Sequence, residues 1–269
     1  MTPASPIEPL EAILRGFGRV AVAVSGGIDS LTLSTIAANA LGDKAHMFHS
    51  MTGSVPREAT ARTRALAAER GWQLTIVDAN EFARGEYMAN PANRCFYCKE
   101  SLYAEIARHT DAQVVSGANT DDLREYRPGL DAARAAGARH PFIEAGASKA
   151  SIRAMARELG LGTLAEIPAS PCLSSRVETG IAIDPVTLRR IESAELAVRA
   201  RIEARAVRCR VRASGIVVEI DADALAAMSA DLRESLGEEV ETIFGVRPAF
   251  APYRSGSAFL VNIPSPLAR

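Results

Sequence analysis

The chain has 269 residues, of which 48% are hydrophobic and 23% charged, and its net charge is −1; this composition is typical of a globular protein with an ample core. The charge balance argues against a dedicated nucleic-acid-binding protein, and no apolar run approaches the roughly 20 residues that a membrane-spanning helix needs. The N-terminus lacks the basic-then-apolar order of a signal peptide, and four cysteines are too few for a disulfide scaffold, so we expect a cytoplasmic protein that keeps its thiols reduced.

A phosphate-binding loop is predicted close to the N-terminus. Residues 20–24 are a run of small and β-branched residues typical of a buried parallel strand, and the sequence SGGIDS follows directly. Glycines let the backbone approach an anion, and the start of the next helix supplies N–H donors. We therefore expect this loop to bind ATP phosphates, with Asp29 suited to Mg²⁺; the contributing residues are Ser25, Gly26, Gly27, Asp29 and Ser30. The alternative is an ordinary strand–helix turn capped by Asp29 and Ser30.

Strands and helices then alternate as far as residue 159. Helices are predicted at residues 7–17, 30–41, 56–71, 99–108, 130–136 and 148–159, strands at 45–50, 72–77 and 113–116, and an extended segment at 140–143. Alternation of this kind predicts an α/β fold with a doubly wound, mostly parallel sheet, whose ligands bind at the carboxyl ends of the strands.

The alternation stops at a Pro- and Ser-rich stretch, residues 165–183, which predicts a functional loop or domain joint. Beyond it, the pattern predicts a helix at 185–204, two strands around Ser214-Gly215, a helix at 222–236 and a strand at 241–246. We thus expect a nucleotide-binding domain over residues 1–165, an active-site loop over 166–183, and a small α+β domain for substrate binding or oligomerisation over 184–269.

The cysteines form one close pair and one candidate partner. Cys95 and Cys98 are spaced so that both thiolates could reach one metal ion or cluster, although alone they also fit half a zinc site, a redox pair or two packed small residues. No second pair follows, and Cys172 is the remaining cysteine in a predicted loop. Cys209 alternates within a strand pattern and is expected to be packed.

Acidic residues after the strand at 113–116 are the next candidates. Asp121 and Asp122 come at the ligand edge of the sheet, where carboxylates could hold Mg²⁺ or a ribose, unless they are simply an exposed helix start. Lys149, in the first turn of a helix, either reaches a phosphate or is solvated. Arg127 could clamp an anion with two donors.

Arginines are clustered in the C-terminal part, mostly on a helix face that we expect to be solvated. Arg210 and Arg212 differ, because they share one face of a strand and therefore converge on one point, where a substrate phosphate fits. Arg254, near the C-terminus, could add a second anion contact.

Five motifs resemble one family over nearly the whole chain. SGGIDS, NRCFYCK, GANTDDLREYRPG, SPCLSSR and YRSGS, in this order, are similar to the LarE-type ATP-dependent sulfur transferases of the PP-loop ATP pyrophosphatase superfamily. The resemblance implies that a carboxylate of a pyridinium mononucleotide is adenylated, with release of pyrophosphate, and converted to a thiocarboxylate for the nickel-pincer nucleotide of lactate racemase. We also expect Arg94 and Arg176, within these motifs, to contact the substrate.

The sulfur source follows from the same resemblance. Some members give up the sulfur of one loop cysteine, and others carry three cysteines that look able to hold a [4Fe–4S] cluster, which implies that Cys95, Cys98 and Cys172 ligate a cluster here. The alternative makes Cys172 a sacrificial donor. Relatives often have a His pair where this chain has Ala213-Ser214, so the detailed contacts with the substrate are not carried over from the resemblance at these two positions.

Three other functions remain open: a tRNA thiolase, an amidating synthetase, and a non-catalytic nucleotide sensor. A tRNA thiolase needs a broad basic surface, and an amidating synthetase needs an ammonia source rather than three loop cysteines. We expect a homo-oligomer that acts on a small-molecule nucleotide, without nucleic-acid or membrane partners.

Overall fold

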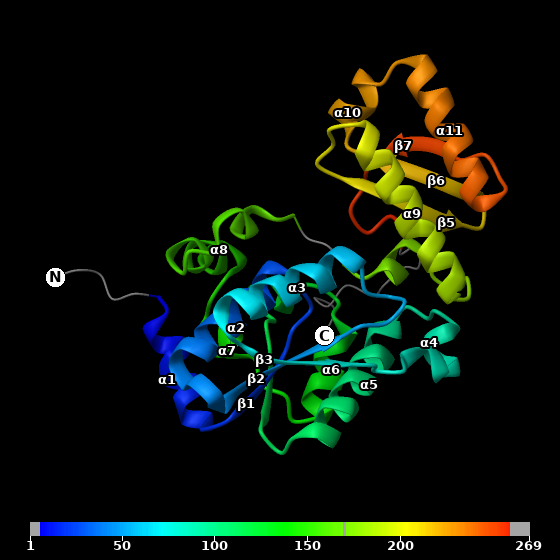
Figure 1. Cartoon of the computed structure of the whole chain (residues 1–269). Helices are drawn as coiled ribbons and strands as arrows, with labels where there is room; N and C mark the ends of the chain where they lie inside the picture. The colour runs from blue at the N-terminus through cyan, green and yellow to red at the C-terminus, as the bar shows by residue number, and fades with distance from the viewer. Residues whose placement is uncertain (1–5, 169–170, 259–269) are drawn as a thin grey trace. The chain divides into compact units, whose positions relative to one another are not determined.

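The computed structural model describes residues 6–168 and 171–258, which form two compact units (Figure 1). The first unit contains residues 6–81 and 93–168, and the second contains residues 82–92 and 171–258. Residues 82–92 therefore pack with the second unit although the chain on either side of them belongs to the first. Within the described residues, no helix has both the length and the apolar character needed to cross a bilayer.

The first unit is built on a parallel four-stranded sheet, which confirms the predicted α/β fold. Its strand order is β3-β2-β1-β4, and each neighbouring pair is parallel. The strands are β1 (Val20–Ala23), β2 (Ala45–Ser50), β3 (Gln73–Val77) and β4 (Gln113–Ser116). The carboxyl ends of β1 and β4 are paired in register, so the loops that follow these two strands begin side by side.

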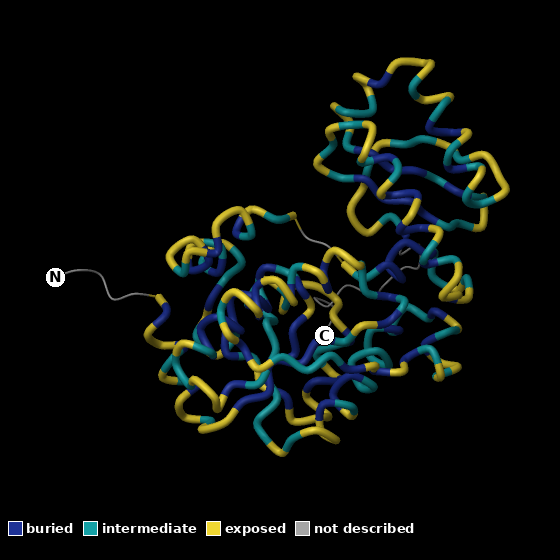
Figure 2. Tube along the Cα trace, in the orientation of Figure 1, coloured by how far each residue is buried: buried dark blue, intermediate teal, exposed yellow. Residues whose placement is uncertain are grey.

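Helices cover both faces of this sheet, as a doubly wound fold requires. Val20 and Val22 face a core formed with α1 (Glu8–Phe17), α2 (Ile28–Leu41), α3 (Arg57–Arg70) and α8 (Lys149–Glu158). Ala21 and Ala23 face a second core formed with α5 (Arg94–His109) and α6 (Pro128–Ala135). Because both faces are covered, all four residues of β1 are buried (Figure 2), which explains its uninterrupted apolar sequence.

Two elements of the first unit differ from the sequence-based expectation. The predicted extended segment at 140–143 is wrong, because Pro141 begins a helical turn, α7 (Pro141–Glu144), in which proline's missing N–H costs nothing. Helix α5 begins at Arg94 rather than at residue 99. Cys95 and Cys98 consequently lie in the first turns of a helix and not in a loop.

The second unit contains a three-stranded sheet with the order β5-β6-β7. Strands β5 (Val207–Arg212) and β6 (Gly215–Ile220) form the expected antiparallel hairpin, and β7 (Ala249–Pro252) is parallel to β6. Helix α9 (Pro185–Arg201) begins where predicted, since the Asp184 side chain accepts hydrogen bonds from the backbone N–H groups of Val186 and Thr187. Helix α4 (Gly85–Met88) also belongs to this unit.

The end of the second unit corrects two further predictions. The single helix expected at 222–236 is interrupted at Met228, so α10 (Ala222–Ala227) is followed by a separate α11 (Ala230–Phe244) that Ser229 caps. The strand expected at 241–246 instead forms the last turn of α11 and the Gly245 cap that ends it. Short apolar runs such as this one fit a strand and a buried helix turn equally well, and packing decides between them.

Candidate functional site

The loop between β1 and α2 places two hydroxyl groups and a helix N-terminus at the carboxyl edge of the sheet. Ser30 Oγ accepts a hydrogen bond from the backbone N of Ser25 at 3.1 Å and donates one to Gly27 O at 2.9 Å. Ser25 Oγ lies 3.1 Å from Ser30 Oγ and accepts from Gly27 N at 3.3 Å. The backbone N–H groups of the first turn of α2 have no carbonyl of their own helix to bind, and a helix start of this kind suits an anion.

The conformation of this loop is fixed from the side of α3. Gly26 has a φ of +78°, and a Cβ at this position would lie only 2.6 Å from Ala59 O, so only glycine fits. Arg62 Nε donates to Gly26 O at 2.8 Å. His49 lies beneath the loop, with Nδ1 2.9 Å from Val24 O and Nε2 2.9 Å from Thr60 Oγ1. Burial lowers the pKa of His49, so the neutral imidazole is favoured here.

Asp29 has one carboxylate oxygen that suits a cation. Its Oδ2 accepts a hydrogen bond from Asn119 Nδ2 at 3.3 Å and lies 3.8 Å from Lys149 Nζ. Its Oδ1 is buried and has no hydrogen-bond partner among the described residues. Burial raises the pKa of Asp29 above its usual range, and the nearby Lys149 ammonium partly offsets this rise. A buried carboxylate oxygen without a donor fits the oxygen ligand that Mg²⁺ prefers.

The loop after β4 packs directly against the start of α2. A Cβ on Gly117 would lie 2.9 Å from Ser30 N, so these two backbones touch. Asp121 Oδ2 accepts a hydrogen bond from Lys149 N at 2.8 Å. Lys149 therefore contacts Asp121 through its backbone N–H and lies near Asp29 through its ammonium group. Arg127 is half exposed and pairs with Asp122 at 3.0 Å and with Glu125 at 2.7 Å.

His140 is a candidate that the sequence analysis did not single out. Its Nδ1 lies 2.9 Å from Ser116 Oγ, at the carboxyl end of β4. Burial lowers the pKa of His140, and the charges of Glu144, Lys99 and Asp122 also act on it. A single histidine before a proline forms no recognisable motif, so nothing in the sequence selects it. His140 lies at this edge of the sheet because its neighbour Arg139 pairs with Val115 of β4.

The cysteines are divided between the two units. Cys95 and Cys98 lie three residues apart in the first turns of α5, in the first unit, and Cys172 lies in the second unit. All three are partly exposed, whereas Cys209 is buried in β5 as predicted. Across residues 6–168 and 171–258, no group of three or more His, Cys, Asp or Glu side chains is arranged to hold a metal ion. The three-cysteine cluster therefore stays a prediction.

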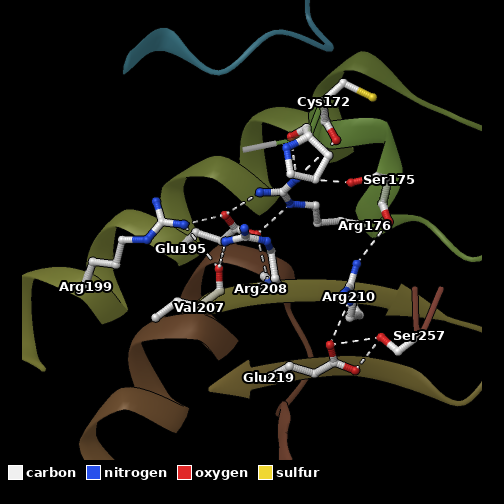
Figure 3. Close-up of polar contacts among 12 residues, drawn as sticks. Cys172, Ser175, Arg176, Glu195, Arg199, Val207, Arg208, Arg210, Glu219 and Ser257 are labelled. Carbon is white, nitrogen blue, oxygen red and sulfur yellow. Dashed lines mark hydrogen bonds and ion pairs between the residues drawn. The ribbon is translucent and has the colours of Figure 1, made fainter. Parts of the chain in front are cut away.

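Cys172 precedes a short 3-10 turn, Leu173–Arg176, that is anchored by the Arg176 guanidinium (Figure 3). The side chain of Arg176 is only 1% exposed. Its Nη1 donates to Pro171 O at 2.6 Å, Cys172 O at 3.1 Å and Ser175 Oγ at 3.1 Å. Arg176, expected as a substrate contact, therefore has its Nη1 directed at its own loop.

Glu195, on α9, receives the other side of that guanidinium. Arg176 Nε and Nη2 donate to Glu195 Oε1 and Oε2 at 2.9 and 3.1 Å, a bidentate pair. Glu195 Oε1 also accepts from the backbone N of Cys209 at 3.1 Å, and Oε2 accepts from Arg199 at 3.0 Å. Glu195 thereby connects the Cys172 turn to both α9 and β5.

Arg210 and Arg212 converge on one point, as their shared strand face predicts, and that point is the carboxylate of Glu219 on β6. Arg210 Nε donates to Glu219 Oε2 at 2.9 Å, and Arg212 Nη2 donates to Oε1. Ser257 Oγ donates to the same carboxylate at 2.7 Å. Arg212 Nε is buried and has no hydrogen-bond partner within the described part of the chain.

The network drawn in Figure 3, together with Arg212, contains more positive than negative groups. Four of its five arginines pair with two glutamates, Arg176 and Arg199 with Glu195 and Arg210 and Arg212 with Glu219. The fifth, Arg208, donates to Val207 O at 2.8 Å. Burial and the neighbouring Arg176 lower the pKa of Arg208 to about 10. A buried excess of cations favours the binding of an anion. Of the other predicted contacts, Arg94 is buried at the start of α5 and Arg254 is exposed after β7.

Comparison with known proteins gives relatives that span most of the chain. It is 30% identical over 203 residues, 74% of this chain and 73% of the relative, to the pyridinium-3,5-bisthiocarboxylic acid mononucleotide synthase of Lactiplantibacillus plantarum. It is 35% identical over 242 residues, 88% of this chain and 89% of the relative, to an uncharacterized protein of Synechocystis sp.. An uncharacterized protein of Methanocaldococcus jannaschii is 28% identical over 209 residues, 76% of this chain and 79% of that protein. No protein-family model matches the chain.

Proposed function

Because the chain belongs to the LarE family of sulfur transferases in the PP-loop superfamily, we propose that it uses ATP to convert a pyridinium mononucleotide carboxylate into a thiocarboxylate. The observation that carries this proposal is the loop of residues 25–30 at the sheet edge, with Asp29 Oδ1 buried and lacking a hydrogen-bond donor among the described residues. The synthase of L. plantarum supports the substrate class. Reduced thiols suit a cytoplasmic reaction.

The first half of the reaction activates the carboxylate. A carboxylate oxygen attacks the α-phosphorus of ATP, the bond to the bridging oxygen breaks, and pyrophosphate leaves with that oxygen. The N–H groups at the start of α2 and the hydroxyls of Ser25 and Ser30 would bind the phosphates, and Lys149 would add positive charge. Asp29 would hold Mg²⁺, which supplies neutralisation of phosphate charge when bound.

The substrate phosphate would be bound in the second unit. Arg210 and Arg212 would supply the contact, with Arg212 Nε as a donor that no described residue uses. The buried excess of positive charge around Arg208 supports an anionic ligand. Arg94, Arg127 and Arg254 remain proposed contacts, and Arg254 is exposed in the turn after β7.

The second half delivers sulfur to the activated carbonyl, and AMP leaves. We propose that Cys95, Cys98 and Cys172 hold a [4Fe–4S] cluster, which would supply sulfide when present. Partly exposed thiols, two of them three residues apart at a helix start, fit such a donor set. In the alternative, Cys172 Sγ attacks the activated carbonyl and displaces AMP, which gives a thioester. Loss of the Cα proton of Cys172 and cleavage of its Cβ–Sγ bond then release the thiocarboxylate and leave dehydroalanine.

Three measurements on the intact protein test the proposal. Incubation with ATP, Mg²⁺ and the carboxylate nucleotide should give AMP and pyrophosphate, whereas ADP and phosphate would overturn it. Iron in anaerobically purified protein and repeated turnover with supplied sulfide would support the cluster. A single turnover with a mass loss of about 34 Da, the mass of H₂S, would instead identify Cys172 as the sulfur donor.

A further inference from the structure

The backbone around Cys172 is held rigidly although its thiol is partly exposed. The carbonyl oxygens of Pro171 and Cys172 both accept from one nitrogen, Arg176 Nη1, at 2.6 and 3.1 Å. On the other side of the turn, Tyr87 Oη lies 2.6 Å from Ser174 Oγ, and Arg210 donates to Ser175 O at 3.0 Å. Leu173–Arg176 are all buried. Cys172 is thus the partly exposed residue at the end of an anchored turn.

The anchor depends on a single ion pair in the interior of the second unit. Arg176 and Glu195 side chains are 1% and 3% exposed, so water cannot replace either partner. Glu195 is itself fixed by the backbone of β5 and by Arg199. A carboxylate held in this way sets the plane of the Arg176 guanidinium, and that plane directs Nη1 at the two carbonyls.

We propose that Arg176, oriented by Glu195, is the positioning residue for Cys172 in sulfur delivery. The inference rests on the proposed function, because it assigns to Cys172 a role in the second half of the reaction. The Cys172 carbonyl and its side chain share one Cα, so holding the carbonyl restricts the directions in which Sγ can point. A misplacement of about 1 Å at a reacting atom can reduce a rate by about 100-fold.

Arginine is required here by geometry rather than by charge. The guanidinium is planar and presents five N–H donors in a fixed arrangement, which lets it bind a carboxylate on one side and carbonyls on the other. A lysine ammonium carries the same charge but cannot make a bidentate contact and reach both carbonyls. Arg176→Lys therefore keeps the charge balance of the network while releasing the turn.

The test compares Arg176→Lys with the wild type in two assays on the full-length protein. Alkylation by iodoacetamide, read by peptide mass spectrometry, compares Cys172 with Cys98 in the same molecule; we expect the ratio to rise at least threefold as the turn loosens. In the kinetic assay we expect kcat for thiocarboxylate formation to fall at least tenfold. Carboxylate-dependent ATP–pyrophosphate exchange and the KM for the nucleotide should stay within twofold.

Arg205→Lys is the matched control, since it makes the same substitution in the same unit at a side chain that is 80% exposed and pairs with the exposed Asp223 at 2.7 Å. It should leave the alkylation ratio and kcat within twofold, and an equal loss in both variants would assign only a stabilising role to Arg176. If Arg176→Lys fails to fold, Tyr87→Phe, which removes the hydroxyl that contacts Ser174, should raise the alkylation ratio.

An unchanged alkylation ratio in a folded variant would overturn the proposal. Absence of transfer by the wild type would instead refute the proposed function, while the alkylation ratio would still report on the anchored turn.

Discussion

Replacing Gly117 by alanine tests whether the loop after β4 sets the position of the phosphate-binding helix. The added methyl would lie 2.9 Å from Ser30 N and 3.0 Å from the carbonyl carbon of Asp29, closer than the roughly 3.4 Å of an ordinary contact. Both neighbours are backbone atoms, so no rotamer change relieves the clash, and α2 must move by about half an ångström. Overpacking of this kind costs about 1–3 kcal/mol.

The expected loss has a thermal and a functional component. A cost of about 1–3 kcal/mol lowers the midpoint of thermal unfolding of a unit of this size by about 2–12 °C. Displacing the N-terminus of α2 also weakens charge-assisted hydrogen bonds to phosphate, each worth roughly 1.5–3 kcal/mol, so ATP affinity should fall about tenfold or more. Scanning calorimetry measures the first effect, and titration calorimetry with ATP and Mg²⁺ measures the second.

Gly16→Ala is the control, because a methyl there meets no atom within 4 Å. It lies in α1, where alanine is favoured over glycine by about 0.5–1 kcal/mol, so this variant should be at least as stable as the wild type. The reasoning fails if Gly117→Ala binds ATP as tightly as Gly16→Ala does. Lower stability with unchanged affinity would show that α2 accommodates the methyl without moving its first turn.

Three more predictions follow from the charges. Asp29→Asn should raise the melting temperature of ligand-free protein at pH 7, because burial raises the pKa of Asp29 and the ionised carboxylate costs stability above that pKa. The same substitution should abolish AMP formation, and retained turnover would contradict the proposed role of Asp29. Burial lowers the pKa of His49, so stability should fall as pH drops below about 6.5, and His49→Gln should remove part of this slope between pH 7.5 and 5. Arg210→Ala should cost about 3–5 kcal/mol in urea unfolding, since it deprives the buried Glu219 of a partner; a loss below about 1 kcal/mol would show that Arg212 and Ser257 suffice.

Local patterns in the chain were enough to predict the ligand edge of the first unit. The apolar run at residues 20–24 can be buried on both sides only where both faces of a strand are covered, and Gly26 after it has a positive φ that other residues avoid. Ser148 caps α8 and Asp184 caps α9 because short polar side chains bind the N–H groups next to them in the chain. These effects act within a few residues and therefore leave a readable sequence signal.

The failed predictions are those in which packing decides between two local choices. The run at 241–246 continues α11 because Leu236 and Val240, four residues apart, are buried on one side of that helix. The start of α5 is a second case, since residues 94–98, expected to precede the helix, form its first turns and include both cysteines of the close pair. In a short window such as 241–246, apolar residues fit helix and strand equally well, and the free energy of burying one side decides.

The sequence by itself determined that Arg210 and Arg212 share a strand face, since side chains alternate with a period of two whatever the strand packs against. Only the tertiary structure decided that their meeting point already holds the carboxylate of Glu219, and that Arg176 directs its guanidinium toward the backbone beside Cys172. Glu219 and Glu195 are separated in the chain from these arginines by 7 to 19 residues. A buried charge pairs with whichever opposite charge the fold brings near it, because leaving it unpaired costs several kcal/mol. Here the partner is decided by the packing of α9, β5 and β6 against one another.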